Sequence, residues 1–346
     1  MKKPFFSIVI PTFNRSEELR KALISILRQD FDDYEIIITD NSSNNESEKM
    51  IRSLNDKRIH HFKNTTNIGF NRNLYKGIKL SQGKYIFLLG DDDIILRKDT
   101  FRDIFIEILK NKYGFVRLKF IYQKNTDTLF TPYFEDKKSL FLEKNQSNIK
   151  ILEFLYNKAI FSHIAGLIFK NIKNIKIEKI ELAKGSEDVE ISNFWIAFLL
   201  SAAKSNGAYI DINHPMIVKW AVYKELGAYL VKKGRITEEQ IFELLSKYLN
   251  KNDMKAWKNK VVYGTVSLLP SIRYYSSKKN LLLYAKRLSE LNKEILKNKS
   301  FYFFLIVGFF MPKLVWDFLR RIYHSKKIVK DEDVLKEFEL LKSSLS

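Results

Sequence analysis

Apolar segments of strand length alternate with amphipathic segments over the first 120 residues, and this alternation limits the fold more than any other feature. "FFSIVIP" (5–11) is a short apolar run that ends at a proline, and "YEIIITD" (34–40) ends at an acid. "RIHHFKN" (58–64) and "KYIFLL" (84–89) read as two further strands. The order predicts an α/β fold with a mostly parallel sheet flanked by helices.

Three segments with apolar residues at helical spacing are expected to cover this sheet. They are residues 16–29, with Ser16 as the expected N-cap, residues 71–83, with Gly83 at the exit, and residues 99–111. At 346 residues, the chain has the length of about two domains.

Polar residues follow three of the predicted strands, in "PTFNR", "TDNSS" and "GDDD". Ligands bind outside the carboxyl ends of strands in such sheets, so these loops are expected to form one crevice. The adjacent carboxylates Asp91, Asp92 and Asp93 repel one another unless water or a cation screens them. Asp91 and Asp93 can point to one side of an extended turn while Asp92 points away. We expect the cluster to face solvent when no ligand is bound.

Charge and composition narrow the class of protein. The net charge of +20 suits a nucleic-acid binder, an acidic substrate or an anionic membrane, although scattered lysines also fit a compositional bias. No nucleic-acid-binding motif is found. The chain has no cysteine, which excludes disulfides and thiolate metal sites. The apolar run before Pro11 is too short for a signal peptide, so a cytoplasmic location is expected.

Residues 4–225 resemble glycosyltransferase family 2, the nucleotide-sugar transferases of the GT-A fold. "FSIVIPTFNR", "YEIIITDNSS", "NIGFNRNLYKGIKLSQGKYIFLLGDDD" and "GSEDVEI" carry the resemblance by their order and spacing. It implies a GT-A (Rossmann-like) catalytic domain over residues 1–222, with a nucleotide-sugar half (1–120) and an acceptor half (121–222). Residues 223–346 would then form a helical C-terminal region.

The resemblance also implies the donor-binding residues. Asp40 would accept a hydrogen bond from the base, or else serve as a helix or turn cap. Arg72 would meet phosphate charge, or else be a solvated helix residue. Asn41 stands where the family often has a second acid, which leaves the identity of the base open. The complete donor-binding set is Pro11, Thr12, Asn14, Asp40, Asn67, Arg72, Asn73, Asp91 and Asp92.

The acid cluster matches the metal motif of the family, in which carboxylates hold Mg²⁺ or Mn²⁺ against the donor diphosphate. Asp91 and Asp93 are the expected metal ligands. Gly90 occupies what is often the first acidic position, so the ligating pair stays open. The alternative is a solvated acidic turn that caps the next helix.

Asp188 matches the general base of the family, with Glu187 as its support. Both residues also fit the role of acids at a helix N-terminus. His163 and His214 are considered as residues near the site or a metal, or simply as packed or exposed side chains.

The most apolar tract lies near the C-terminus. Residues 301–311 would extend only about 16 Å as a helix, too short to cross a bilayer. Because basic residues flank the tract, residues 301–327 suit a segment on an anionic membrane surface. The alternative is a buried or dimer-forming helix, although Pro312 favours a bent surface element.

The function implied by the resemblance is inverting transfer of a sugar from a nucleotide sugar to a glycan acceptor that is lipid-linked, in surface polysaccharide or glycoconjugate synthesis. The enzyme would lie on the inner face of the cell membrane, with no nucleic-acid partner. One alternative is a nucleotidyltransferase, although "PTFNRSEE" lacks the glycine-rich phosphate loop usual there. The other is a basic binding protein without catalysis.

Overall fold

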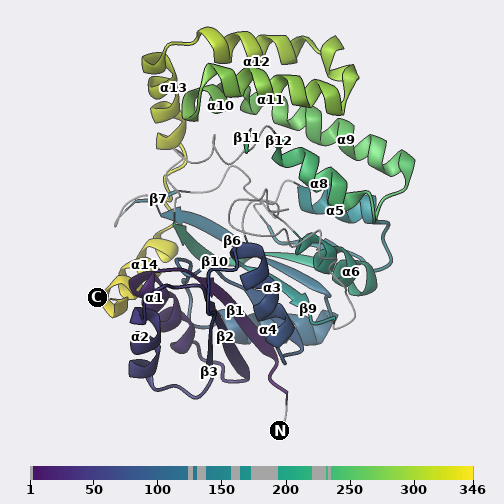
Figure 1. Cartoon of the computed structure of the whole chain (residues 1–346). Helices are drawn as coiled ribbons and strands as arrows, with labels where there is room; N and C mark the ends of the chain where they lie inside the picture. The colour runs from purple at the N-terminus through teal and green to yellow at the C-terminus, as the bar shows by residue number, and fades with distance from the viewer. Residues whose placement is uncertain are drawn as a thin grey trace. The chain divides into compact units, whose positions relative to one another are not determined.

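The computed structural model describes residues 3–123, 128–130, 138–156, 164–172, 194–219, 231–232 and 235–345. The chain forms two compact units (Figure 1). The first comprises residues 1–188, 194–220 and 327–346, and the second comprises residues 189–193 and 221–326. Residues 327–346 thus return to the first unit, which corrects the expectation that all of 223–346 form one C-terminal region.

A ten-stranded mixed sheet forms the centre of the first unit, in the order β3-β2-β1-β4-β9-β6-β10-β5, with β7 beside β6 and β8 beside β10. Its strands are β1 (Phe6–Thr12), β2 (Tyr34–Asp40), β3 (Ile59–Lys63), β4 (Tyr85–Leu88), β5 (Ile94–Ile95), β6 (Phe115–Gln123), β7 (Leu129–Phe130), β8 (Leu140–Leu142), β9 (Leu167–Lys170) and β10 (Ala208–Lys219).

The half of the sheet built from β1 to β4 is parallel, as the alternation predicts. β1 pairs with β2 and β4, β2 pairs with β3, and Thr12 lies opposite Asp40. The carboxyl ends of these strands therefore meet at one edge. Pro11 does not end β1, because the Asn41 amide N–H still donates to the Thr12 carbonyl at 3.0 Å.

The other half of the sheet mixes strand directions. β9 is antiparallel to both β4 and β6, while β10 is parallel to β6 and antiparallel to β5 and β8. The predicted α/β class is confirmed, and β9 joins the parallel half to the rest of the sheet.

Helices cover both faces of the sheet because residues alternate between its two sides. Leu23 of α1 and Phe101 of α4 pack in one core with Ile8. On the other face, Tyr75 of α3 meets Phe194, next to α6, with ring centroids 5.9 Å apart. The helices of this unit are α1 (Ser16–Leu27), α2 (Glu46–Leu54), α3 (Phe70–Leu80), α4 (Thr100–Asn111), α5 (Asn148–Tyr156), α6 (Ile196–Asn206) and α14 (Glu332–Leu345).

Two predicted helix boundaries are wrong. Ser16 is the first residue of α1 rather than its cap, and Arg15 precedes the helix without a capping side-chain hydrogen bond. α3 ends at Leu80, and Gly83 lies against β1 instead, where an added Cβ would come within 2.6 Å of the Ser7 Oγ.

The last helix, α14, belongs to the first unit because its apolar face completes a second core there. Phe338 and Leu341 pack with Ile94 of β5, Ile121 of β6 and Ile217 of β10. Figure 1 shows α14 beside α1.

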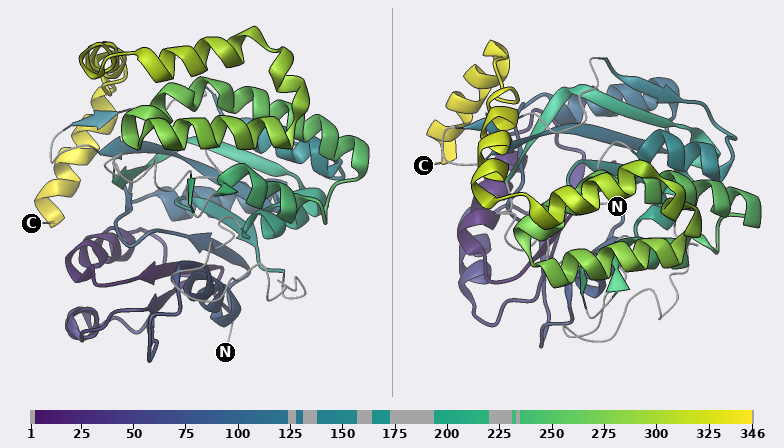
Figure 2. Two further views of the ribbon diagram at one scale, coloured as in Figure 1. Left: turned by 45° about the horizontal axis from the view of Figure 1, so that its top comes forward. Right: turned by 90° about the horizontal axis from the view of Figure 1, so that it is seen from above.

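The second unit is mainly helical (Figure 2). Trp257, Tyr284 and Phe301 are among its buried side chains, and α12 packs on α10. Its elements are β11 (Val231–Lys232), β12 (Arg235–Ile236), α8 (Thr237–Leu245), α9 (Lys251–Thr265), the 3₁₀ helix η2 (Val266–Leu268), α10 (Leu269–Tyr275), α11 (Lys278–Leu291), the 3₁₀ helix η3 (Lys293–Lys297), α12 (Lys299–Phe310) and α13 (Lys313–Ser325).

Candidate active site

The loop after β1 is tied to the loop after β2. Asn14 adopts a left-handed backbone conformation (φ 52°), which asparagine tolerates better than most residues. Its N–H donates to the Ser42 Oγ at 2.8 Å, and its Oδ1 accepts from the Ser43 N–H at 3.0 Å. Pro11 is buried within β1 itself, directly before Thr12. Two of the three predicted strand-end loops therefore meet.

The acid cluster after β4 joins the same edge, because β4 runs parallel to β1. The Thr12 Oγ1 donates to the Asp91 Oδ2 at 2.8 Å. The Arg15 Nη1 lies 3.3 Å from the Asp91 Oδ1 and 3.0 Å from the Asp92 Oδ2. Arg15 is half exposed, so its guanidinium is also accessible to an anionic ligand.

Gly90 has a role that the sequence did not reveal. The Asp93 Oδ2 accepts a hydrogen bond from the Gly90 N–H at 2.8 Å. A Cβ added at residue 90 would lie 2.5 Å from that same oxygen. The glycine in the first position of the acidic motif therefore allows the Asp93 carboxylate to turn back against the backbone.

Asp91 and Asp93 are buried, at 7% and 5% exposure, and the expectation of a solvent-facing cluster is wrong for both. Burial and the nearby charge of Asp92 raise the pKa of Asp91 to about 6, against the opposing effects of Thr12 and Arg15. Burial and Asp92 raise the pKa of Asp93 further, although the Gly90 N–H opposes this. Two carboxylates that are costly to ionise lie beside the edge where a ligand would bind.

Arg117 of β6 supplies a second positive charge near Asp93, and its charge lowers the Asp93 pKa somewhat. This side chain is fully buried, donates to the Ala165 carbonyl, and lies 4.9 Å from the Phe120 ring centroid. Burial lowers the pKa of Arg117 to about 10. Its Nε and Nη2 have no hydrogen-bond partner among the described residues.

The strand-end acids have the chemistry of a site for a hard divalent cation. Carboxylate oxygens are the ligands that Mg²⁺ and Mn²⁺ prefer, and a cation would offset the cost of ionising two buried acids. Within the described ranges, the one group of three ligand atoms within 4.8 Å of one another is Asp99, Asp103 and His214, not the strand-end acids. An ion at Asp91 and Asp93 would therefore need further oxygen ligands from its substrate.

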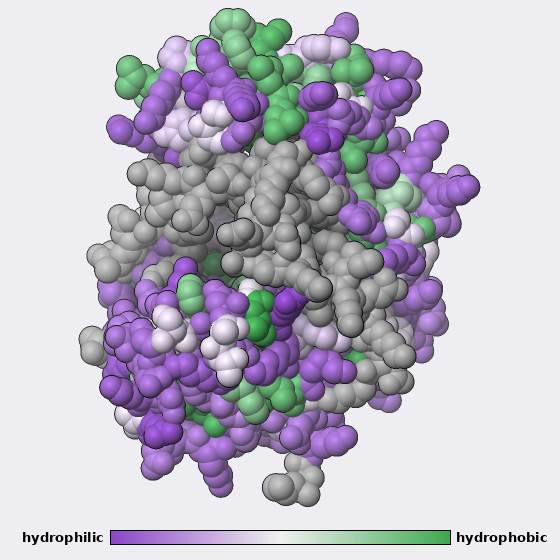
Figure 3. Space-filling model, viewed as in Figure 1, coloured by the Kyte–Doolittle hydropathy of each residue, from purple (hydrophilic) through white to green (hydrophobic). Residues whose placement is uncertain are grey.

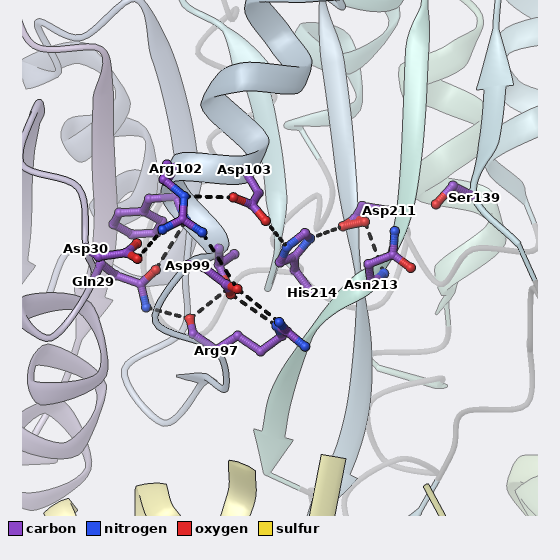
Figure 4. A network of polar contacts seen from close by, with 12 residues as sticks. Gln29, Asp30, Arg97, Asp99, Arg102, Asp103, Ser139, Asp211, Asn213 and His214 are labelled. Atoms are coloured by element: carbon purple, nitrogen blue, oxygen red, sulfur yellow. Dashed lines mark hydrogen bonds and ion pairs between the residues drawn. The ribbon is translucent and has the colours of Figure 1, made fainter. Parts of the chain in front are cut away.

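The Asp99, Asp103 and His214 group is already held by other side chains (Figure 4). The His214 Nδ1 lies 2.7 Å from the Asp211 Oδ2, and its Nε2 lies 3.2 Å from the Asp103 Oδ2. Arg97 forms a bidentate pair with Asp99, at 2.9 and 3.1 Å. These contacts join α4 to β10, and we interpret the network as structural rather than as a metal site.

Asp40 lies in the predicted position at the end of β2 but is completely buried. Its Oδ1 accepts from the Ser42 N–H at 2.7 Å, and its Oδ2 lies 3.0 Å from the His61 Nε2. Burial alone would raise the pKa of Asp40, but these contacts outweigh it and lower the pKa. A donor base can reach this carboxylate only if neighbouring residues move, so its role in base binding stays a prediction.

The asparagines around α3 hold the segment that leads into this helix. The Asn73 Nδ2 donates to the Thr39 carbonyl at 2.7 Å, and the Asn73 Oδ1 accepts from the Asn64 Nδ2 at 2.8 Å. The Asn64 Nδ2 also donates to the Asn41 Oδ1 at 2.8 Å. Asn73 and Asn41 thus support the loops rather than reach outward.

The remaining donor-binding predictions lie on the same segment. The Asn67 Oδ1 accepts from the Gly69 N–H at 2.9 Å, and Arg72 is half-buried on α3. Asp188, Glu187 and His163 lie outside the described residues. Sequence reasoning missed Arg15, Arg117 and Asn64. Two of these left a signal: Arg15 ends the strand-end loop "PTFNR", and Arg117 is a charged residue within the apolar run "FVRLKF".

The sequence and the fold of this chain are similar to those of known glycosyltransferases. Residues 7–172 match the family model described as glycosyl transferase family 2. A beta-1,3-glucosyltransferase of Campylobacter jejuni, named for the substrate GalNAc(5)-diNAcBac-PP-undecaprenol, is 38% identical over 96 residues, which are 27% of this chain and 31% of that protein. The poly(ribitol-phosphate) beta-N-acetylglucosaminyltransferase TarP of Staphylococcus aureus is 28% identical over 63% of each chain. The chain thus spans about a third of the first relative and less than two thirds of the second.

Solved structures share the fold. Residues 1–349 of S. aureus TarS, crystallised with UDP-GlcNAc, superpose with a TM-score of 0.51 at 14% sequence identity, over 88% of this chain and 91% of that one. The predicted GT-A architecture, with a helical C-terminal region, is confirmed by this likeness.

Proposed function

We propose, on the match of residues 7–172 to glycosyl transferase family 2, that the chain transfers a sugar from a nucleotide sugar to a glycan, with inversion and with a divalent cation. The observation that carries the proposal is the pair of buried acids, Asp91 and Asp93, at the edge where the loop after β1 brings Thr12 and Arg15. This is the edge where an open α/β sheet binds its ligand.

Each side chain has a distinct part in the proposed reaction. Asp91 and Asp93 would hold Mg²⁺ or Mn²⁺, which stabilises the negative charge of the leaving diphosphate. Arg15, which lies beside Asp91 and Asp92, would also meet this charge. Because Arg15 is half exposed and pairs with two acids, it can exchange an aspartate for a phosphate oxygen at small cost.

Inversion requires a base on the acceptor side. The acceptor hydroxyl oxygen bonds to the anomeric carbon while the bond from that carbon to the diphosphate breaks, and the hydroxyl proton passes to a carboxylate. We assign that role to Asp188, with Glu187 as its support, on the family motif. The donor nucleotide is expected to lie over the loops of Asn14, Asp40 and Asn67.

We further propose a lipid-linked acceptor, in the synthesis of a surface polysaccharide or glycoconjugate, on the inner face of the cell membrane. The Campylobacter relative is named for an undecaprenol-linked glycan and TarP for poly(ribitol-phosphate), so both relatives are named for polymers or lipid-linked glycans. A chain with net charge +20 also suits an acidic acceptor or an anionic membrane.

Thermal unfolding with a panel of nucleotide sugars tests the proposal. One nucleotide sugar should raise the unfolding temperature with Mn²⁺ and lose most of that effect with excess chelator. The same donor should give no Mn²⁺-dependent shift in Asp93→Asn, while Asp99→Asn serves as the control in the Arg97 network. A response that is lost in Asp99→Asn and kept in Asp93→Asn would overturn the assignment.

A further inference from the structure

Helix α13 exposes a stripe of apolar side chains, while its inner side packs both Trp316 and Asp317 against Tyr274 of α10. Leu314 and Phe318 are 83% and 62% exposed, and Val315, Leu319 and Ile322 are exposed along the same stripe. On the inner side, the Tyr274 Oη donates to the Asp317 Oδ1 at 2.5 Å. A surface helix of a water-soluble domain has the opposite arrangement.

Helix α12 is apolar on both of its sides. Phe301 is buried, and Gly308 packs closely on Pro270 of α10. On its outer side, Phe303, Ile306 and Phe310 are 60%, 57% and 73% exposed. With the exposed stripe of α13 they form what we call the α12–α13 apolar face, and Figure 3 shows hydrophobic residues among hydrophilic ones over α12. Apolar faces of this extent mark interaction sites.

The two helices cannot form one straight membrane span. No single described helix is long and apolar enough to cross a membrane. Lys299–Phe310 and Lys313–Ile322 together have the length and composition of a membrane span, but they are bent by 115° relative to one another. Met311 and Pro312 form the break between them. The bend that the sequence predicted at Pro312 is therefore present, and it suits an element that lies along a surface.

The charge around the apolar face identifies what it contacts. Residues 293–326 of the second unit contain seven lysines and arginines and two acids, and one of those acids, Asp317, already accepts a hydrogen bond from Tyr274. Lys313, Arg321 and Lys326 are exposed beside the apolar stripe. A second copy of this face in a two-fold dimer would bring the same basic groups together, which is unfavourable. Anionic lipid head groups would neutralise them, and their acyl chains would accept the apolar side chains.

We propose that α12 and α13 lie in the interfacial layer of a bilayer that contains anionic lipid, with the α12–α13 apolar face directed into it. This deepens the proposed function by naming the element that would bring the enzyme to a lipid-linked acceptor. The binding itself requires neither donor nor metal, so it is measured apart from glycosyl transfer.

Flotation with vesicles tests the proposal on the full chain. The probes are vesicles of phosphatidylcholine alone and vesicles that also contain phosphatidylglycerol. The double variant Leu314→Ser/Phe318→Ser should bind the anionic vesicles about 100-fold more weakly than wild type, because two large apolar side chains no longer insert. The matched control is Ile106→Ser/Leu109→Ser, which removes two exposed apolar residues from α4 and should bind as wild type does.

Charge is tested separately with Lys313→Gln/Arg321→Gln, which should weaken binding to the anionic vesicles about 30-fold at low salt and leave the weak binding to phosphatidylcholine unchanged. Light scattering without lipid tests the alternative that a second copy of the chain covers the α12–α13 apolar face. If Leu314→Ser/Phe318→Ser binds vesicles as tightly as wild type, the proposal is wrong. It is equally wrong if wild type does not float but forms a dimer that this variant abolishes.

Discussion

Replacing Asp91 by Asn should stabilise the folded protein in the absence of divalent metal, although it removes a proposed metal ligand. The pKa of Asp91 is about 6 in the folded chain against 3.8 in a free carboxyl, which corresponds to a cost of about 3 kcal/mol for keeping it ionised. Because the folded pKa is the higher one, this cost is fully present above pH 6 and disappears as the pH falls towards 4. An asparagine keeps an oxygen that accepts from Thr12, and the half-exposed Arg15 loses little.

The assay is urea unfolding with excess chelator at pH 8 and at pH 4. Asp91→Asn should be more stable than wild type by up to about 3 kcal/mol at pH 8 and by almost nothing at pH 4. With Mn²⁺ at pH 8, wild type should gain stability and the variant should not. Glu48→Gln on the surface of α2 changes the net charge equally and serves as the control. If Asp91→Asn is destabilised at pH 8, or if it behaves as Glu48→Gln does, the electrostatic account of the cluster is refuted.

Three further changes test other parts of the account. Gly90→Ala should displace the Asp93 carboxylate, because the new Cβ would lie 2.5 Å from the Asp93 Oδ2. It should remove the Mn²⁺-dependent thermal shift with little change in the unfolding temperature of the metal-free protein; an unaltered Mn²⁺ response would exclude Asp93 as a ligand. Asp188→Asn should lower turnover about 100- to 10,000-fold and leave donor affinity unchanged, and near-normal transfer would assign the base elsewhere. Burial lowers the pKa of His214, but Asp211 and Asp103 outweigh it and raise the pKa above 6.5. The stabilising effect of the His214 charge is therefore complete below pH 6.5 and is lost as the pH rises through the folded pKa. The difference in free energy of unfolding between wild type and His214→Gln should shrink between pH 6 and pH 8.5. A constant difference in urea unfolding would contradict this.

The sequence was most informative about which segments form strands and helices, although it misplaced the start of α1 and the end of α3. β1, β2 and β4 are apolar runs bounded by polar loops, and their ends brought Thr12, Asp40 and Asp91 to one edge because parallel strands share a direction. Periodicity also located α1, α3 and α4 to within a few residues.

Contacts between distant residues were beyond the sequence. His214 meets Asp103 across 111 positions, and neither residue lies in a motif. The antiparallel insertion of β9 between β4 and β6 depends on pairing that no local pattern encodes. α14 is amphipathic, but its periodicity says only that it has an apolar face, not that this face packs on Ile121 and Ile217. The sequence also could not show that Asp91 and Asp93 are buried, because an acidic triplet is ordinarily solvated and burial depends on the folded structure around it.

The most direct test of the central claim is a crystal structure with Mn²⁺ and the nucleoside diphosphate selected by the thermal-shift panel, measured at the manganese absorption edge. The account predicts an anomalous peak bound by the carboxylates of Asp91 and Asp93 and by the diphosphate, with the nucleotide at the carboxyl ends of β1, β2 and β4. A peak at Asp99, Asp103 and His214 instead, or a bound diphosphate with no manganese at Asp91 and Asp93, would contradict it.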